Sequence, residues 1–456
     1  MAPAPSILAD ILPLDAQTFV GIIVVVVVIH VILGHIPLLI YLERKISAYI
    51  QDRIGPNRVG LDFGLPVLRR LFRGFGFWGL GQALADGVKF FLKEDYMPRG
   101  ADRFLFSLAP IAAVVPALIG WAVIPWGGWL DVPDITLWGT HLVQGGRALV
   151  AAADINIGFV YMLAAASLGV YGVTLGGWAG NNKYSFLGGL RASAGMISYE
   201  IPMGLSILAV LLLAGSVRPD VIVQTQISSL PDGGWLVFAQ PLACVLFYVC
   251  ILAEANRAPF DNPEAEQELV GGYHTEYSSM RFALFFLGEY AHMLGSSAFC
   301  VVLFFGGYHL PFVALTHPGE TGLLAVLVKF LVLFTKVMLS VCFMMLVRWT
   351  LPRIRYDQVL KLAWSAMIPI TIAIVVATSL MIFFGWTATW QMLLMNVVLA
   401  VGVLVFGPLL PESNVNRRIP LAGSRFSPLP GERVVTGAAP GLHTADDPHE
   451  SLVGSR

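Results

Sequence analysis

Apolar residues run almost without interruption through long stretches of the chain between residues 20 and 410. An α-helix needs about 20 apolar residues to cross a ~30 Å hydrocarbon core, and at these lengths only helices satisfy their own backbone in lipid. The pattern therefore predicts an all-α polytopic membrane protein. About nine transmembrane helices are expected, near residues 20–42, 104–126, 151–178, 192–214, 235–253, 281–305, 321–347, 359–384 and 387–410.

The polar ends of the chain set the limits of this membrane domain. Residues 1–19 form an N-terminal segment, residues 20–410 the membrane domain, and residues 411–456 a tail rich in Pro, Gly, Ser and charged residues. A segment of that composition has little apolar surface to bury, so we expect a flexible extension. No internal repeat of the apolar pattern is visible, which weighs against a transporter built from inverted repeats.

Positive charges gather in alternate connections between the predicted spans. Of the 28 Lys and Arg residues, 24 fall on one side of a nine-helix arrangement, in the tail and in the connections 43–103, 179–191, 254–280 and 348–358 and at their borders. The positive-inside rule makes that side cytoplasmic, with the N-terminus outside and the C-terminus inside. Lys is scarce relative to Arg, which suggests GC-rich coding and a bacterial inner (plasma) membrane; a mitochondrial inner membrane is the alternative.

Composition supports the membrane assignment and excludes other classes. Hydrophobic residues make up 57% of the chain and charged residues 12%, and mean hydropathy is +0.74, so the apolar surface must meet lipid. A net charge of -1 argues against general binding to nucleic acid, which requires clustered Lys and Arg. The four cysteines lie in apolar runs at spacings unlike those of zinc or iron–sulfur sites, so we predict no metal site.

Two cytoplasmic stretches have the pattern of amphipathic helices at the membrane surface. Apolar Ile46, Tyr49 and Ile50 recur at helical spacing with Arg53 after the first span, until Gly and Pro interrupt the pattern at residues 55–56. A second stretch begins near Gly81. The periodicity by itself favours simple anchoring to the membrane surface.

Acidic residues form the most distinctive feature of the sequence. Seven carboxylates fall within 36 residues: Glu254, Asp261, Glu264, Glu266, Glu268, Glu276 and Glu289. Glu289 and Glu200 are each placed about eight residues, or roughly 12 Å, inside a predicted span. An acid at such depth costs about 2.5–3.5 kcal/mol, which favours a wet or protein-lined position on an ion or proton path.

Structural alternatives exist for these residues. A solvated loop explains the acids of the connection 254–280 from charge alone. Glu254 has Arg257 one turn away as a possible partner, and Lys336 can neutralise a single acid between helices. For Glu200 and Glu289 the depth favours function over structure.

Several motifs resemble one known family. The quoted positions are Pro259-Phe260-Asp261-x-Pro263-Glu264-Ala265-Glu266-x-Glu268-Leu269-x-x-Gly272, Gly79-x-x-Gln82-x-x-x-Asp86-Gly87-x-Lys89, Glu43-Arg44-Lys45, Gly55-Pro56-Asn57-Arg58-Val59-Gly60, Gly177-Trp178-Ala179, Lys183-Tyr184-Ser185, Ser198-Tyr199-Glu200 and Arg355-Tyr356-Asp357-Gln358. In this order, over about residues 20 to 410, they resemble the quinone-site H-type membrane subunit of proton-pumping NADH:quinone oxidoreductase, respiratory complex I.

The resemblance implies long tilted helices at the heel of an L-shaped complex. Its cytoplasmic loops would contact the quinone-module peripheral subunits, and its helices would contact other membrane-arm subunits and lipid. Quinone, the substrate, would enter from the bilayer. This chain would bind no cofactor and hold no redox centre, because NADH, FMN and the iron–sulfur clusters would belong to partner subunits.

The resemblance also assigns candidate roles to individual residues. Those implied at the quinone entrance or binding site are Arg44, Arg53, Arg58, Asp86, Lys89 and Phe260. Those implied in proton coupling are Glu200, Glu254, Asp261, Glu264, Glu266, Glu268, Glu276 and Glu289, with Lys336 as counter-charge. A pair that merely joins two helices is the structural alternative for Lys336.

Three departures from the family pattern affect these expectations. Residues 61–78 form an insertion at the implied quinone entrance, Ser167 replaces a carboxylate found in some members, and Asn262 replaces the more usual apolar residue inside the signature. The rival functions are the homologous membrane subunit of a related hydrogenase or non-NADH dehydrogenase, a stand-alone ion transporter and a structural scaffold. A scaffold would not require acids inside the spans.

Overall fold

The computed structural model describes residues 14–60, 67, 70, 77–137, 140–228, 234–263 and 266–406. Most of the 61–78 insertion, the tail 411–456, most of the N-terminal segment and Glu264 lie outside these residues. Met1–Val401 form one compact unit, which contains every element up to α14 and most of α15.

Helices dominate the described chain. The longer ones are α1 (Ala16–Ile50), α3 (Gly81–Leu92), α4 (Arg103–Ile119), α5 (Gly158–Ala179), α6 (Lys183–Ala214), α7 (Pro219–Ser228), α9 (Pro241–Glu254), α11 (Ser279–Phe304), α12 (Leu323–Thr350), α14 (Ile368–Phe383) and α15 (Thr389–Phe406). Short helical turns are η1 (Phe77–Gly79), η2 (Gly120–Val123), α8 (Leu236–Ala239), α10 (Glu266–Leu269), η3 (Gly272–His274), η4 (Ala314–Thr316), α13 (Tyr356–Lys361) and the π-helical η5 (Leu362–Met367).

The predicted all-α polytopic membrane fold is confirmed. Within the described residues, seven helical segments are long and apolar enough to cross a membrane: Ala16–Ile50, Arg103–Val123, Gly158–Ala179, Lys183–Ala214, Ser279–Phe304, Leu323–Thr350 and Tyr356–Phe383. The other two predicted spans, 235–253 and 387–410, contain the shorter apolar helices Pro241–Glu254 and Thr389–Val405.

Helix α1 shows how an apolar helix divides its surface between protein and lipid. Its buried residues recur at every third or fourth position: Ala16, Val20, Val24, Val28, Ile32, Ile36 and Leu39. The opposite face carries exposed Ile22, Ile23 and Val26. Side chains that are exposed, apolar and contiguous on a membrane helix suit contact with acyl chains, so one stripe packs and the other faces lipid.

The same helix continues further than the sequence pattern indicated. The span predicted for 20–42 and much of the amphipathic stretch after it form one helix that ends at Ile50. No Gly follows Gly34 and no Pro follows Pro37 until Gly55-Pro56, so nothing in the sequence interrupts the helix earlier. At ~1.5 Å per residue, its 35 residues exceed the thickness of the hydrocarbon core, and Glu43 lies in the part that approaches the membrane surface.

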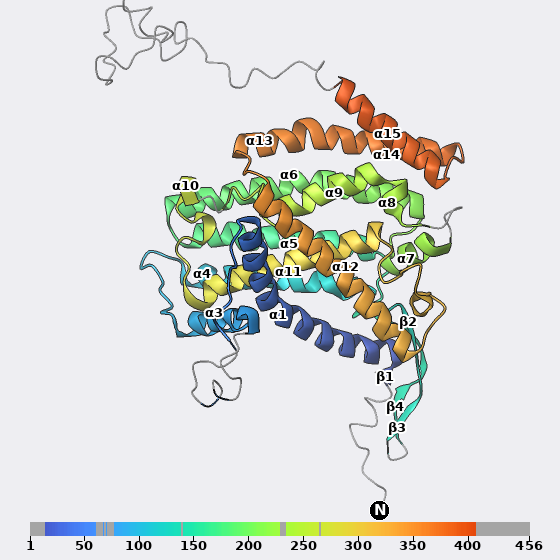
Figure 1. Ribbon diagram of the computed structural model, residues 1–456, viewed down its shortest axis with the longest axis horizontal. Helices are drawn as coiled ribbons and strands as arrows, with labels where there is room; N and C mark the ends of the chain where they lie inside the picture. Colours follow the sequence, from blue (N-terminus) through green and yellow to red (C-terminus); the bar gives the residue numbers. More distant parts are fainter. Residues whose placement is uncertain are drawn as a thin grey trace, which may run out of the picture. The chain divides into compact units, whose positions relative to one another are not determined.

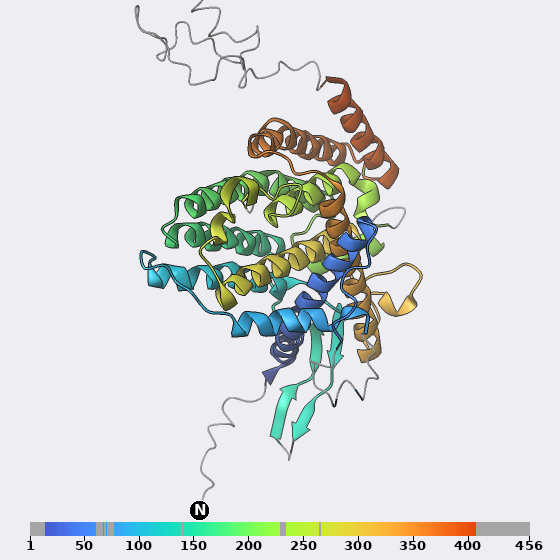
Figure 2. The ribbon, with the colours of Figure 1, turned by 60° about the vertical axis from the view of Figure 1, so that its left-hand side comes forward.

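Small residues allow three helices to approach closely. A Cβ atom added at Gly172 of α5 would lie 2.5 Å from the backbone nitrogen of Ala113 in α4, and one at Gly288 of α11 would lie 3.2 Å from the Ala113 carbonyl oxygen. Close backbone approach at small residues is the usual way in which membrane helices pack. Helices α4, α5, α6 and α11 accordingly lie side by side, with α9 next to α6 (Figure 1, Figure 2).

Helix α9 is short because the chain is broken before it. Helix α8 ends at Ala239, Gln240 is not helical, and Pro241 begins α9. The fully buried Gln240 amide donates to Thr378 Oγ1 at 3.0 Å and accepts from Asn396 Nδ2 at 3.1 Å. A break of this kind inside a membrane protein requires such partners, because lipid supplies none.

Two small sheets occupy the connection at 127–150, for which the sequence pattern predicted no strands. Strand β2 (Trp129–Val132) pairs antiparallel with β5 (Gly146–Leu149). Strand β4 (Thr140–Gln144) pairs with β3 (Ile135–Leu137) and, in parallel, with β1 (Leu14–Asp15). In Figure 1 these strands and α7 lie at one end of the helices, and α3, α10 and α13 lie at the other.

Candidate proton-coupling site

A buried carboxylate, Glu43 of α1, lies at the centre of a group of charged side chains. It is 7% exposed and accepts hydrogen bonds from the Tyr290 hydroxyl of α11 and from Arg348 of α12. Arg257, just after α9, places Nη1 3.5 Å from both Glu43 oxygens. Four segments distant in sequence therefore meet at one carboxylate.

Arg257 connects this group to Glu289, one of the acids predicted from the sequence. Its Nε lies 3.0 Å from Glu289 Oε1, and its guanidinium lies over the Tyr290 ring, 4.4 Å from the centroid. Two carboxylates thus meet two guanidinium groups, counting Arg348, and the formal charges balance. Balance matters here because an unpaired buried charge is strongly destabilising.

The local backbone conformation places Arg257 beside the charged side chains around Glu43. Helix α9 ends at Glu254, and Asn256 has a φ of 49°, a left-handed conformation that Asn adopts more readily than most residues. The chain then turns, with the backbone nitrogen of Ile354 donating to the Pro259 carbonyl oxygen at 3.0 Å. Asp261 pairs with Arg353 at 2.8 Å in the same region. The start of the acidic connection is therefore fixed against the chain that follows α12.

A second group of polar side chains comes from α6, α9 and α11. Glu254 Oε1, in a residue that is 3% exposed, is 3.6 Å from His292 Nε2 of α11. Glu200 of α6 interacts electrostatically with both and lies beside the hydroxyl group of Ser167. The two acids predicted to lie within spans, Glu200 and Glu289, thus flank a Glu254–His292 pair.

Two cavities meet at that pair. One, of about 50 Å³, is lined by Glu254, Glu289, His292 and Asn256 together with small residues of α4, α5 and α11. The other, of about 40 Å³, also includes Glu254 and His292 and extends between α5, α6 and α9. A site needs only about 10–15 Å³ and a few polar partners to hold a water molecule, so both cavities are large enough.

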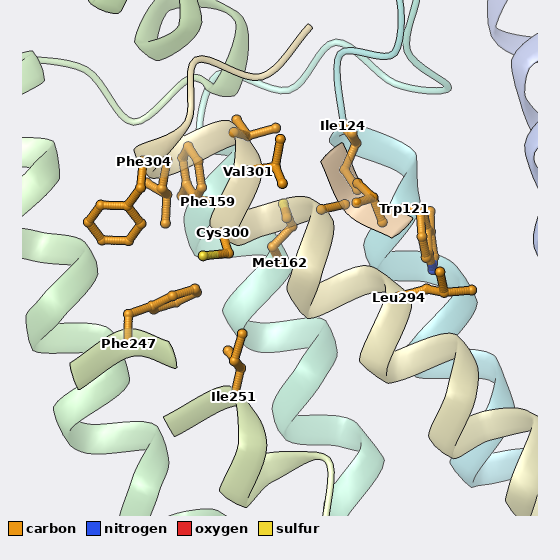
Figure 3. Close-up of a cluster of buried hydrophobic side chains, with 14 of the residues drawn as sticks. Trp121, Ile124, Phe159, Met162, Phe247, Ile251, Leu294, Cys300, Val301 and Phe304 are labelled. Carbon is orange, nitrogen blue, oxygen red and sulfur yellow. The ribbon is translucent and has the colours of Figure 1, made fainter. Parts of the chain in front are cut away.

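The wall of the second cavity, of about 40 Å³, is mostly apolar. Met162 of α5 and Phe247 and Ile251 of α9 line it, and they belong to the buried cluster drawn in Figure 3. In that view these side chains point towards one another from α5 and α9, beside α11. An apolar wall with one polar edge restricts proton exchange to that edge, where Glu254 and His292 lie.

A match to a known family covers the same residues. The family model described as NADH dehydrogenase matches residues 22–379, which include all the side chains named above. A relative from Cytophaga hutchinsonii, named as the first H-type subunit of NADH-quinone oxidoreductase, is 45% identical over 74% of this chain and 89% of its own length. The chain belongs to the family of H-type subunits of NADH-quinone oxidoreductase.

Other members of the H-type family cover still more of the chain. The second H-type subunit of Geobacter metallireducens is 41% identical over 82% of this chain and 99% of its own length. A protein of Rhodothermus marinus named NADH-quinone oxidoreductase subunit 8 is 42% identical over 80% of this chain and 98% of its own. The family resemblance inferred from the motifs is therefore confirmed.

The other acids expected from the H-type pattern have separate local partners. Glu268 pairs with Arg191 of α6 at 2.5 Å, and Glu276 accepts from Asn182 Nδ2 at 2.6 Å. Glu264 and the side chain of Glu266 lie outside the described residues. The structure thus brings Glu254, Glu289 and Glu200 together and leaves Asp261, Glu268 and Glu276 distributed along the connection.

Aromatic packing fixes the end of this connection. The Tyr277 ring stacks on Phe106 of α4, with centroids 4.0 Å apart and planes within 4°. The Tyr277 ring also forms a T-shaped contact with Phe285, with centroids 4.8 Å apart. Burial among these rings raises the pKa of Tyr277 above its ordinary value, so the phenol stays neutral at physiological pH.

Among the residues expected at the quinone entrance, two form a direct contact. Arg44 of α1 pairs with Asp86 of α3 at 2.7 Å, and Asp86 also accepts from Gln82. Arg53, Arg58 and Lys89 are exposed. Phe260 is buried against Tyr199, with ring centroids 5.3 Å apart, and so lies within the connection after α9.

Lys336 interacts with backbone oxygens. Its Nζ donates to the carbonyl oxygens of Phe305, Gly307 and His309 at 2.7, 3.0 and 2.6 Å, and lies over the Trp235 ring. These carbonyls follow the C-terminus of α11, where unsatisfied oxygens and the helix dipole favour a cation. This geometry matches the structural alternative for Lys336 more closely than a pairing with an acid.

Four residues of the site were not predicted from the sequence pattern. Glu43 belongs to one of the quoted motifs, but the motif assigns it no individual role. Tyr290, His292 and Arg348 lie outside the quoted motifs. A signal was available for His292, because it lies three residues after Glu289 and therefore on the same helix face. Among the described residues, no three His, Cys, Asp or Glu side chains are grouped as a metal site.

Proposed function

We propose that this chain is the membrane subunit of a bacterial NADH:quinone oxidoreductase that forms the quinone entrance and part of the quinone chamber. It couples quinone reduction to proton translocation through Glu254, Glu289 and Glu200. The observation that carries the proposal is that Glu254 and Glu289 line cavities of water size inside an apolar helix bundle, and that Glu200 interacts electrostatically with Glu254. Acids in such places usually belong to ion or proton paths.

The coupling rests on electrostatics. Reduction of quinone adds negative charge and draws protons, which alters the field at the acidic connection above the cavities. Because Arg257 is shared between Glu43 and Glu289, a change in charge at one acid alters the balance at the other. Interacting groups of this kind take up and release protons as a set. Glu264, Glu266, Glu268, Asp261 and Glu276 belong to this proposed set, whereas Lys336 donates to backbone carbonyls and is not assigned to it.

The proposed quinone entrance lies at α1 and α3. Helix α3 exposes Leu84, Val88, Phe91 and Leu92, and the Arg44–Asp86 pair holds it to α1. An exposed apolar face beside charged groups fits a substrate with an apolar tail and a polar head. Arg53, Arg58, Lys89 and Phe260 complete the proposed surroundings of the entrance and chamber.

The chain acts as one part of a larger enzyme in this proposal. NADH, FMN and the iron–sulfur clusters belong to peripheral partner subunits, and further membrane-arm subunits continue the proton path. The names of the relatives favour this complex over a related hydrogenase. The proposed location is the inner membrane, with the N-terminus outside and α3, α10 and α13 on the cytoplasmic side.

The test replaces Glu200 by Gln in the intact complex. Gln has nearly the same shape, and no ion pair of the described structure involves Glu200, so the change removes a titrating group without leaving a charge unpaired. With assembled complex confirmed, we expect NADH:quinone turnover and proton pumping to fall roughly tenfold or more, since positioned proton-transfer groups contribute ~10²–10⁴. Glu289→Gln should also lower turnover and pumping, but it removes one of the two carboxylates that pair with Arg257 and should therefore destabilise the buried cluster as well.

The matched control is Glu94→Gln. Glu94 is an exposed acid just after α3 that lines neither cavity, and Glu94→Gln should keep wild-type turnover and pumping. If Glu200→Gln and Glu289→Gln both retain full turnover and full pumping, the coupling role is wrong. The buried acids would then be structural, and the chain an anchor for the peripheral subunits.

A further inference from the structure

His292 occupies the boundary between the two cavities. Together with Glu254, Ala117 and Ala166, it lines both of them. Its side chain is 19% exposed, and the cavities that it lines account for a polar ring being accessible so far inside the helix bundle. The charge cluster around Glu43 does not involve His292, so its position calls for a separate explanation.

The facing atoms of His292 and Glu254 lie just beyond hydrogen-bond distance. The 3.6 Å between Nε2 and Oε1 is slightly longer than a hydrogen bond, and within the described residues neither atom has a hydrogen-bond partner. A small side-chain rotation closes the gap, and the adjoining cavities can supply water to both atoms. Buried polar groups otherwise incur a desolvation cost, so an unclosed pair beside a cavity suits a group that changes partners.

We propose that His292 is a proton-carrying residue that links Glu254 to Glu200. The inference rests on the proposed coupling function and specifies the route between two of its acids. The O–H bond of protonated Glu254 breaks as an N–H bond forms at Nε2. The imidazolium then releases a proton through cavity water towards Glu200, and the ring returns to its neutral form without any redox change.

The charges that face His292 fit this role. Helix α9 contributes Glu254, α6 contributes Glu200, and α11 itself contributes Glu289 one turn earlier. The described lining from α4 and α5 is uncharged, including Pro116, Ala117 and Met162. An imidazolium is therefore stabilised by carboxylates on two sides and meets no positive charge from that lining. Imidazole is also the side chain best suited to gain and lose protons near neutral pH.

The experiment measures turnover and proton pumping of the complete complex carrying His292→Asn. Asn keeps a polar side chain of similar reach but does not titrate. We expect turnover per assembled complex to fall roughly tenfold or more, in line with the usual contribution of a proton-transfer group. The loss should vary with pH, because imidazole gains and loses a proton near neutral pH and Asn does not. A purely structural role predicts an equal loss at every pH, and that result overturns the inference.

Two controls separate packing from proton transfer. Ser297→Ala changes a buried residue of α11 that contacts Met344 and lines neither cavity, and His30→Asn removes an exposed imidazole from α1. Both should retain wild-type turnover and the wild-type pH profile. A drop in Ser297→Ala equal to that in His292→Asn would assign the effect to packing and would also contradict the inference.

Glu254→Gln distinguishes the proposed role of His292 from the proposed coupling function on which that role rests. If Glu254→Gln and Glu200→Gln impair pumping while His292→Asn is fully active, the carboxylate route stands and the histidine link is wrong. If Glu254→Gln, Glu200→Gln and His292→Asn are all fully active, the proposed function fails together with the inference. Impairment in all three, with a pH-dependent loss for His292→Asn, supports both.

Discussion

At the scale of single residues, Glu43 is a buried carboxylate with three side-chain partners. Burying one carboxylate would be costly, but Tyr290, Arg257 and Arg348 surround it and supply hydrogen bonds or positive charge. Two acids and two guanidinium groups balance in this cluster. Removing any one charge should therefore weaken the interactions of the other three and destabilise the cluster. The side chain thus holds α1, α11, α12 and the connection after α9 in one arrangement.

Glu43→Gln should therefore destabilise the protein. The change removes the carboxylate that pairs with Arg348 and leaves Arg257 with Glu289 alone, and breaking a buried pair costs roughly 3–5 kcal/mol. We expect less assembled complex in the membrane and a lower thermal transition, measured on purified complex beside Glu94→Gln. The double change Glu43→Gln with Arg348→Gln restores the charge balance and should recover part of the loss. A stability equal to wild type for the single variant would contradict this account.

At the scale of secondary-structure elements, helix ends carry much of the polar chemistry. Lys336 reaches from α12 to three carbonyls that follow α11, and the Arg44–Asp86 pair joins α1 to α3. The two contacts should differ in their contribution to stability. The Lys336 hydrogen bonds are partly buried in the bundle, whereas the Arg44–Asp86 ion pair lies at the surface. Buried hydrogen bonds to charged groups contribute more than exposed ion pairs.

Lys336→Met should weaken the junction of α11 and α12. Met fills much of the same space but cannot donate, so three carbonyls lose a partner, at a cost on the order of 1–3 kcal/mol. We expect a lower thermal transition, with turnover and pumping per assembled complex close to wild type. Thermal unfolding and proton-pumping assays on the same preparation check both parts. A selective loss of pumping at unchanged stability would instead assign Lys336 to the proton path.

Asp86→Asn should produce a mild effect that is limited to the apparent KM for quinone. Exposed ion pairs are worth ~0.2–1 kcal/mol, so loss of the Arg44 contact should raise the apparent KM for quinone by no more than about fivefold. Turnover at saturating quinone should not change. Steady-state kinetics in membranes, with NADH in excess, measure both quantities. An unchanged KM for both Asp86→Asn and Arg44→Gln would remove α1 and α3 from the quinone entrance.

At the scale of the whole molecule, sidedness follows from where the connections lie. The strands at 129–149 are at one end of the helices, and α3, α10 and α13 at the other (Figure 1). The positive charges of the chain favour the latter end as cytoplasmic. Three of the four natural cysteines are buried and one is partly buried, so the chain is suited to labelling at introduced cysteines.

Thr136→Cys and Arg99→Cys should react from opposite sides of the membrane. Both positions are exposed, the first in β3 and the second between α3 and α4. In intact cells, a maleimide that cannot cross the membrane should label Cys at position 136 and leave position 99 unlabelled. Inverted vesicles should show the reverse. Labelling from the same side at both positions would contradict the predicted orientation.

The sequence by itself determined the class of the fold and the rough positions of the seven spans found within the described residues. Those depend on runs of about 20 apolar residues, which one-dimensional patterns record directly. It also located the deep acids Glu200 and Glu289, because a charge inside an apolar run stands out. The strands at 129–149 were missed since that connection is short, mixed in composition and defined mainly by pairing with residues elsewhere.

Only the tertiary structure decided which charges meet. Glu43 and its partners Arg257, Tyr290 and Arg348 are 214, 247 and 305 residues apart in sequence. A membrane helix is apolar on nearly every face, so its pattern does not reveal which face meets a neighbour and which meets lipid. The crossing of α9 and α11 likewise placed His292 beside Glu254 and left cavities there, because cavities arise from packing between helices and have no counterpart in a linear pattern.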